Sequence, residues 1–166
     1  MKQIHRFILF LILISLPFVS WGCVASLPLK GVDPEGQKIY LGPVPIEKTK
    51  AYQAFLLSSK SETAKLYYLL DRIKAAKEVT YRFEGSQYNY FEAYLAALWL
   101  LIYHYKRGED AHSFIRKEIA AYAGFSESTT MNFPDGSYHI AYHVLINELD
   151  LLEETFKQHI HSPRRG

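Results

Sequence analysis

An unbroken stretch without a charged residue, from Ala93 to Tyr103, constrains the fold of this 166-residue chain more than any other feature. Asn89 and Glu92 precede it with the spacing of a helix-capping box, which predicts a helix that begins there. The stretch is too short to cross a bilayer, which takes about 20 apolar residues. A helix that is apolar on every side is normally buried. We therefore predict that it is the central helix of the core. The large side chains expected to be buried there are Leu95, Leu98, Trp99 and Ile102.

The rest of the pattern predicts a mostly helical domain around this helix. Helical periodicity extends over residues 47–59, over 59–77, over 109–122, and from Ser137 into a long last helix. Alternating β-branched and aromatic residues over 79–83, followed by turn residues, predict a hairpin, and residues 131–133 predict another short strand. The expected fold class is α+β, mostly α, with four to five helices packed around the central apolar helix. We expect the β part to be a small hairpin or a three-stranded sheet.

Composition excludes several protein classes. The chain is 49% hydrophobic and 22% charged, which is typical of one globular domain and excludes a protein that is disordered over its whole length. Its single cysteine excludes a disulfide framework, a multi-cysteine zinc module and an iron–sulfur protein.

The N-terminus has the features of an export signal. Lys2 and Arg6 precede the uncharged, apolar run 7–19, which is too short to span a membrane and contains Pro17. The run ends shortly before Gly22-Cys23, which resembles the lipobox of bacterial lipoproteins, although Ser20 and Trp21 depart from the usual box. We expect cleavage before Cys23 and lipid attachment to it. Ordinary signal-peptidase cleavage, which would give a soluble periplasmic or secreted protein, and an uncleaved anchor are the alternatives.

The predicted organisation has four parts. Residues 1–22 are the signal peptide, 23–45 a Pro/Gly-rich tether, 46–160 a single globular helical domain, and 161–166 a disordered tail. An alternative for residues 38–41 of the tether is that they dock on the domain as a strand. Removing the signal leaves 17 basic and 17 acidic residues, so the mature chain is neutral. A neutral domain lacks the positive charge of a nucleic-acid binder, and we expect no nucleic-acid partner.

The order of several short motifs resembles the YfeK-like family of small exported bacterial proteins, a family of unknown function. The motifs are Gly85-Ser86-x-Tyr88, Glu92-Ala93, Glu109-Asp110-Ala111-x-x-Phe114-Ile115, Ser126-x-Ser128, and the Leu-x-x-Glu-Leu segment that ends at Leu149. The resemblance covers roughly residues 62–155 and implies a similar fold and export to the cell envelope. It implies no site, because Phe83-Glu84 stands where the family usually has Arg-Asn, and Ala96 where it has His.

Candidate catalytic groups are few. His139 and His143 have the i, i+4 spacing with which a helix can present two imidazoles to one metal, with His104 or His112 as a third ligand. The motif lacks the glutamate of zinc proteases, and we expect these histidines to be ordinary helix residues. We expect the other polar groups to have structural rather than catalytic roles. Ser126 and Ser128 are expected to bond backbone, and Glu148, Asp150, Glu153 and Glu154 to form a solvated helix face.

The 13 tyrosines, many of them near the hairpin and central helix, suit either a core or a binding groove, and we favour the core. The sequence thus predicts an envelope protein, lipid-anchored through Cys23 and facing the periplasm, with Val24 favouring delivery to the outer membrane. We predict a non-catalytic binding or structural module with a possible envelope protein partner, and no catalytic residue, cofactor or metal. A carrier or sensor of a small apolar ligand and a histidine-based metal-dependent hydrolase remain alternatives.

Overall fold

The computed structural model describes residues 29–120 and 129–161. The predicted signal peptide, Cys23, the pair Ser126 and Ser128, and residues 162–166 of the predicted tail lie outside these ranges. The helical elements are η1 Ile46–Lys48, α2 Lys50–Leu57, α3 Glu62–Ala75, α4 Tyr90–His104, α5 Ala111–Ile115, the π-helical turn η2 Arg116–Ala120, and α6 Ala141–His161. The strands are β1 Thr80–Phe83, β2 Ser86–Tyr88, β3 Thr130–Asn132 and β4 Tyr138–Ile140. The prediction of an α+β, mostly α fold is confirmed.

The strands form one antiparallel sheet in the order β2-β1-β3-β4. The predicted hairpin is β1 and β2, with Tyr81 opposite Tyr88. The sheet has one strand more than predicted, because the turn after β3 returns the chain as β4 before the last helix begins. Hydrogen bonds between Phe133 and Ser137 and between Gly136 and Phe133 close that turn. Ser137 therefore lies in the turn and does not cap the last helix.

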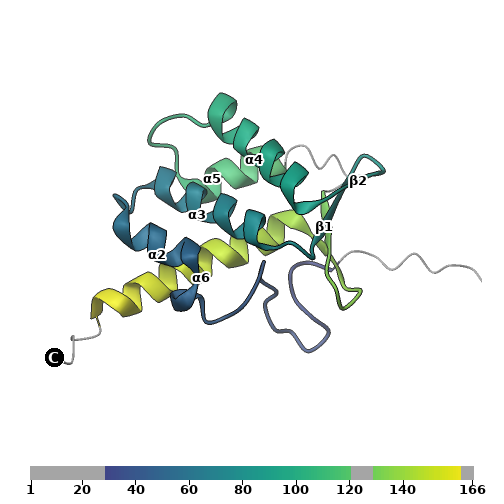
Figure 1. Ribbon diagram of the computed structural model, residues 1–166, viewed down its shortest axis with the longest axis horizontal. Helices are drawn as coiled ribbons and strands as arrows, with labels where there is room; N and C mark the ends of the chain where they lie inside the picture. The colour runs from purple at the N-terminus through teal and green to yellow at the C-terminus, as the bar shows by residue number, and fades with distance from the viewer. Residues whose placement is uncertain (1–28, 121–128, 162–166) are drawn as a thin grey trace, which may run out of the picture.

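The core gathers buried side chains of α2, α3, α5 and α6, together with Tyr81 and Met131 of the sheet. Figure 1 shows the sheet at one end of these helices. Helix α6 runs lengthwise through the domain, and α3 lies between it and α4. Leu149, Leu152 and Val144 of α6 are fully buried, as the apolar spacing of the last helix predicts.

Helix α4 is not the centre of the core. Of its 15 residues, only Leu101 is buried. The prediction that Leu95, Trp99 and Ile102 are buried is wrong, since all three are exposed, while Leu98 is half-buried. The helix packs on α3 from outside, and nothing in the described part of the chain covers its other side.

The predicted tether is wrong for residues 29–45, which pack on the domain. Leu29 forms a parallel bridge with His139 of β4, donating its N–H to the Tyr138 carbonyl and accepting from Ile140. Leu41 is buried in the core. Docking of residues 38–41 was the alternative, but they add no strand to the sheet. Prolines and glycines prevent regular structure here without preventing packing, because other groups of the fold satisfy the backbone.

Side chains of α6 hold this N-terminal segment in place. The Asn147 amide donates to the carbonyls of Gly31 and Ile39 at 2.7 and 3.1 Å. Glu148 accepts from the N–H of Leu41 at 2.9 Å. Glu148 is fully buried, so its predicted place on a solvated face is wrong. The residue is buried because its carboxylate also binds Arg72 and the hydroxyl of Tyr68.

Candidate interaction surface on helix α4

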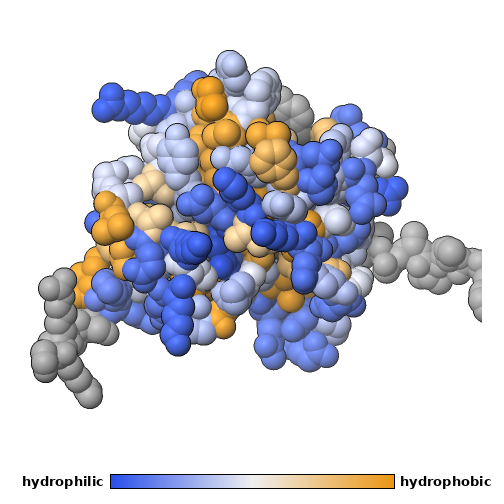
Figure 2. Space-filling view, viewed as in Figure 1, coloured by the Kyte–Doolittle hydropathy of each residue, from blue (hydrophilic) through white to orange (hydrophobic). Residues whose placement is uncertain are grey.

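The most unusual surface of the molecule is the outer side of α4. Its large apolar residues leave 47–70% of their area exposed, and we call this set the α4 face. It consists of Phe91, Leu95, Trp99, Ile102 and Tyr103. Figure 2 shows hydrophobic side chains gathered over α4, near the top of the view. Contiguous apolar patches on a monomer commonly mark interaction sites.

Local sequence explains why this segment is helical. The side chain of Asn89 accepts hydrogen bonds from the N–H groups of Phe91 and Glu92, and the Glu92 carboxylate accepts one from the Asn89 N–H at 2.8 Å. This capping box is the one predicted. It satisfies free backbone groups of the first turn and so fixes where the helix begins.

The distribution of residue sizes around α4 explains which side faces outward. Small residues and one leucine recur every four positions on the inner side, at Ala93, Ala97 and Leu101. They allow α4 to lie close to α3. Four large residues recur every four positions on the outer side, at Phe91, Leu95, Trp99 and Tyr103. Residues four apart lie on one helical ridge, so the outer side presents a continuous ridge of apolar side chains.

The α4 face is nearly free of charge. Glu92 is the one carboxylate in α4, and its side chain is engaged in the cap. At one edge of the face, the Lys74 ammonium of α3 lies 5.0 Å from the ring centre of Tyr94, a cation–π contact. Tyr94 in turn stacks on Phe91. The aromatic rings of this edge are therefore held in place before any partner binds.

A polar network supports the C-terminal end of α4. His104 Nδ1 lies 2.7 Å from Glu118 Oε2, and Lys117 binds both Glu118 and Glu109. Burial raises the pKa of Glu118, but the hydrogen bonds from His104 and Lys117 outweigh it and hold this pKa below its usual value. The ring of His104 also lies against Trp99, with 4.9 Å between ring centres. The contact with His104 thus helps to orient the Trp99 ring.

The two histidines of the predicted pair do not lie on one face of a helix. His139 is in β4 and His143 in α6. His139 is fully buried, and neither of its ring nitrogens has a hydrogen-bond partner among the described residues. Burial lowers the pKa of both imidazoles. Gly31 packs so closely on His143 that an added Cβ would lie 2.8 Å from the His143 Cβ. Residues 29–31 therefore pack against both histidines, and within the described ranges no third metal-ligating side chain joins them.

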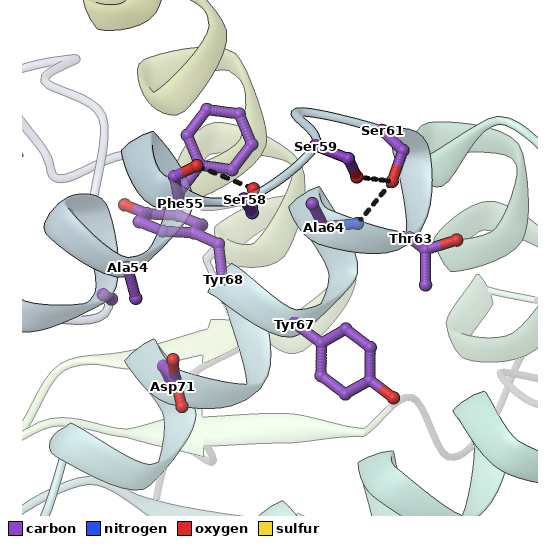
Figure 3. A pocket seen from close by; sticks show the side chains of 11 residues that line it. Ala54, Phe55, Ser58, Ser59, Ser61, Thr63, Ala64, Tyr67, Tyr68 and Asp71 are labelled. Carbon is purple, nitrogen blue, oxygen red and sulfur yellow. Dashed lines mark hydrogen bonds between the residues drawn. The ribbon is translucent and has the colours of Figure 1, made fainter.

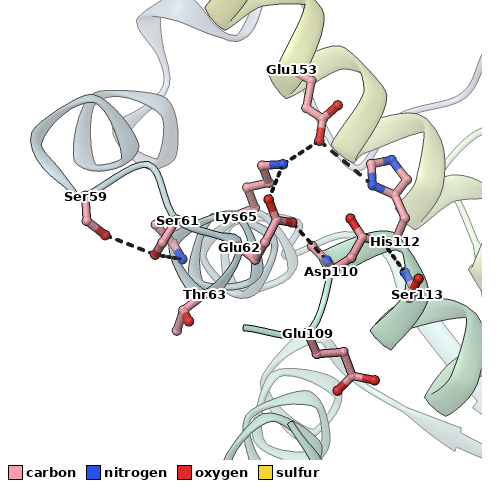
Figure 4. Close-up of polar contacts among 12 residues, drawn as sticks. Ser59, Ser61, Glu62, Thr63, Lys65, Glu109, Asp110, His112, Ser113 and Glu153 are labelled. Carbon is pink, nitrogen blue, oxygen red and sulfur yellow. Dashed lines mark hydrogen bonds and ion pairs between the residues drawn. The ribbon is translucent and has the colours of Figure 1, made fainter. Parts of the chain in front are cut away.

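A second polar cluster joins α3, α5 and α6 (Figure 4). The Lys65 ammonium lies 2.7 Å from carboxylates of both Glu62 and Glu153, and His112 contacts Asp150 at 3.2 Å. Glu153 is thus paired rather than simply solvated as predicted. Within residues 29–120 and 129–161, no three His, Cys, Asp or Glu side chains gather as a metal site would require. The cluster links three helices through ion pairs and hydrogen bonds among its own residues.

A shallow hollow of about 260 Å³ lies between α2 and α3 (Figure 3). Its hydroxyl groups bond locally: Ser58 donates to the Phe55 carbonyl, and Ser59 to Ser61. The hollow is open and below the usual size of a ligand pocket, about 300–1,000 Å³. It does not resemble the enclosed apolar cavity expected of a carrier.

The predicted tyrosine core is correct only in part. Tyr52, Tyr68 and Tyr81 are buried, whereas Tyr67 and Tyr103 are exposed. Sequence reasoning missed the α4 face because uniform apolarity was interpreted as burial. The size difference between the row 93, 97, 101 and the row 91, 95, 99, 103 indicates which side packs inward.

Two further findings bear on the chain as a whole. No helix within the described ranges combines the length and apolar character needed to cross a bilayer. Comparison with protein-family models, with curated proteins and with solved structures finds no match to this chain. The resemblance to the YfeK-like family therefore stays a prediction.

Proposed function

We propose that this protein is an exported, lipid-anchored envelope protein that acts as a non-catalytic binding module. Cys23 is the lipid attachment site, and the α4 face is the surface that binds a protein partner. The observation that carries the proposal is the exposure of five large apolar side chains on one helix whose inner side packs on α3. Three of the five are Phe, Trp or Tyr, residue types enriched in protein interfaces.

The chemistry of the face suits binding better than catalysis. It offers apolar area and aromatic rings, but no nucleophile, base or metal ligand at its centre. Aromatic side chains that are already ordered lose little conformational entropy on binding. The contacts of Tyr94 with Lys74 and of Trp99 with His104 provide that order.

The docked N-terminal segment places the domain close to the proposed anchor. Leu29 is fixed against β4, so only residues 24–28 separate the folded domain from Cys23. At 3.3–3.6 Å per extended residue, this connection spans at most about 20 Å. A lipid on Cys23 would keep the domain at the membrane surface, where the α4 face would meet membrane-associated proteins.

The anchor and the binding surface are tested separately. The intact mass of the mature protein from membranes should show an acylated N-terminal Cys23. An unmodified product that begins at Ser26 would refute the anchor. For the surface, a photoreactive residue at Trp99 or Leu95 should give crosslinked protein adducts in cells.

Leu57 of α2 is the matched control for crosslinking, because it is an isolated leucine with 90% of its area exposed. A photoreactive residue there should give no specific adduct. Equal crosslinking from positions 57, 95 and 99, or none from 95 and 99, would refute the α4 face as a binding surface.

A further inference from the structure

We propose that the protein partner of the α4 face is a second copy of this chain, which packs its own α4 face against the first in an antiparallel, two-fold symmetric dimer. This inference rests on the proposed function and names the occupant of the same surface.

The exposed area fits a small dimer interface. Aromatic side chains bury about 150–250 Å² each, so the three that are about half exposed, with Leu95 and Ile102 beside them, offer about 500 Å² per copy. Two copies would bury about 1,000 Å², which is the lower limit for a specific protein interface. We therefore expect a weak dimer with a micromolar dissociation constant.

The absence of charge makes the face compatible with itself. A two-fold interface brings the same surface of both copies together, so an unpaired charge near the axis would meet the same charge of the second copy, and one farther out would be buried against apolar side chains. Glu92 lies in the first turn and is held by Asn89, and the other four-fifths of the helix carries no acidic or basic residue except the terminal His104. The α4 faces of two copies can therefore meet without a charge conflict.

The spacing of the ridge also suits a two-fold axis. Phe91 and Tyr103 are equally far in sequence from Ala97, and so are Leu95 and Trp99. An antiparallel pair centred at that level places Leu95 against Trp99 of the second copy and Phe91 against its Tyr103. Each contact occurs twice, as two-fold symmetry requires.

The ridge predicts the crossing geometry as well. Phe91, Leu95, Trp99 and Tyr103 form one i, i+4 ridge, and Tyr94, Leu98 and Ile102 form the next. Packing such ridges into the grooves of an identical helix gives a crossing angle of about −50°. If Cys23 is lipidated, confinement of both copies to one membrane surface raises their effective concentration and favours a pair that is weak in solution.

The test uses the mature chain, residues 23–166, with Cys23→Ser. This change removes the lipid and the only thiol, and the mature chain retains every described contact, all of which lie within residues 29–161. Sedimentation equilibrium in the absence of detergent, from about 1 to about 200 µM, brackets the dissociation constant expected of a small interface. The average mass should rise from one copy to two.

Variants distinguish dimerisation through the α4 face from nonspecific association. Trp99→Glu should weaken dimerisation at least about tenfold, as expected for a central aromatic contact. Leu57→Glu should dimerise like the parent, because Leu57 lies on α2. Circular dichroism checks that each variant is folded, and Leu95→Gln provides a milder change on the same face. Dimerisation that a folded Trp99→Glu variant does not weaken, or that Leu57→Glu abolishes, would overturn the proposal.

Disulfide trapping tests the register. In the thiol-free parent, chains with Leu95→Cys mixed with chains with Trp99→Cys should form disulfide-linked dimers faster than either chain alone. Faster linkage of Leu95→Cys to itself would overturn the antiparallel pairing.

The remaining outcomes identify another occupant. A protein that stays monomeric at about 200 µM, far above the micromolar range expected for this interface, overturns the proposal. If that monomer sediments with phosphatidylethanolamine–phosphatidylglycerol vesicles, and Trp99→Glu prevents it, the face binds a membrane instead. If the monomer does not bind vesicles but a photoreactive residue at position 99 still crosslinks in cells, the proposed function is supported and the partner is a different protein. If crosslinking is also absent, both proposals fail.

Discussion

Replacing Glu148 by Gln tests whether one buried ion pair fastens three parts of the fold together. The Glu148 carboxylate is fully buried and accepts from Arg72 Nε, from the Tyr68 hydroxyl at 2.8 Å and from the Leu41 N–H at 2.9 Å. These donors come from α3 and from the docked N-terminal segment. Burial, followed by the negative charge of Glu148, raises the pKa of Tyr68 far above its usual value, so this hydroxyl stays a donor.

The magnitude follows from the charge that the substitution leaves behind. Gln keeps the shape of the side chain but removes the negative charge, and the Arg72 side chain, only 3% exposed, then has no counter-charge. Breaking one half of a buried pair costs about 3–5 kcal/mol. Because domains are stable by only about 5–15 kcal/mol, Glu148→Gln should remove a large part of the free energy of unfolding.

Urea denaturation followed by circular dichroism at pH 7 measures this loss. The matched control is Glu154→Gln, on the same helix but exposed, which should change the free energy of unfolding by less than about 0.5 kcal/mol. Adding Arg72→Met to Glu148→Gln should recover part of the loss, since no charge is then left uncompensated and the Gln oxygen still accepts from Tyr68 and Leu41. A cost of Glu148→Gln below about 1 kcal/mol, or equal to that of Glu154→Gln, would refute the ion pair as a structural link.

Three further predictions concern other contacts. Burial lowers the pKa of His139, so below pH about 6.5 the unfolded chain binds a proton that the folded chain does not, and stability should fall as the pH falls. His139→Leu should flatten this decline in urea titrations between pH 7 and 5, leaving the part due to His143, and an unchanged decline would contradict the assignment. Gly31→Ala should cost at least about 1 kcal/mol in urea denaturation, because Gly31 has φ +71° and lies against His143. Ala at the exposed Gly36, also at positive φ but with open space around it, separates the backbone strain from the clash. Asn89→Ala should lower the thermal midpoint through a loss of about 1 kcal/mol at the α4 cap, and no shift would contradict the capping box.

Local chemistry made several elements predictable. The hairpin β1–β2 follows from the alternation before Gly85, whose positive φ of 76° the turn requires. The start of α4 follows from Asn89 and Glu92, which bond each other three residues apart. The strand β4 was missed because its three residues also fit the helical period of the segment that follows.

The candidate site was predictable only as a helix. An apolar sequence indicates that a segment prefers burial, but not whether the rest of the fold has enough surface to bury it. Here α3 covers the side that carries Ala93 and Ala97, and the large residues opposite remain exposed.

By itself, the sequence determined the fold class, the hairpin and the cap of α4, because these depend on residues within a few positions of one another. Tertiary structure decided which side of α4 stays exposed, that Glu148 is buried, and that residues 29–45 pack on the domain. Each of those outcomes depends on groups far apart in the chain, such as Arg72 and Glu148, which are 76 residues apart. A charge is stable in the core only when its counter-charge arrives there as well, and only the folded chain brings the two together.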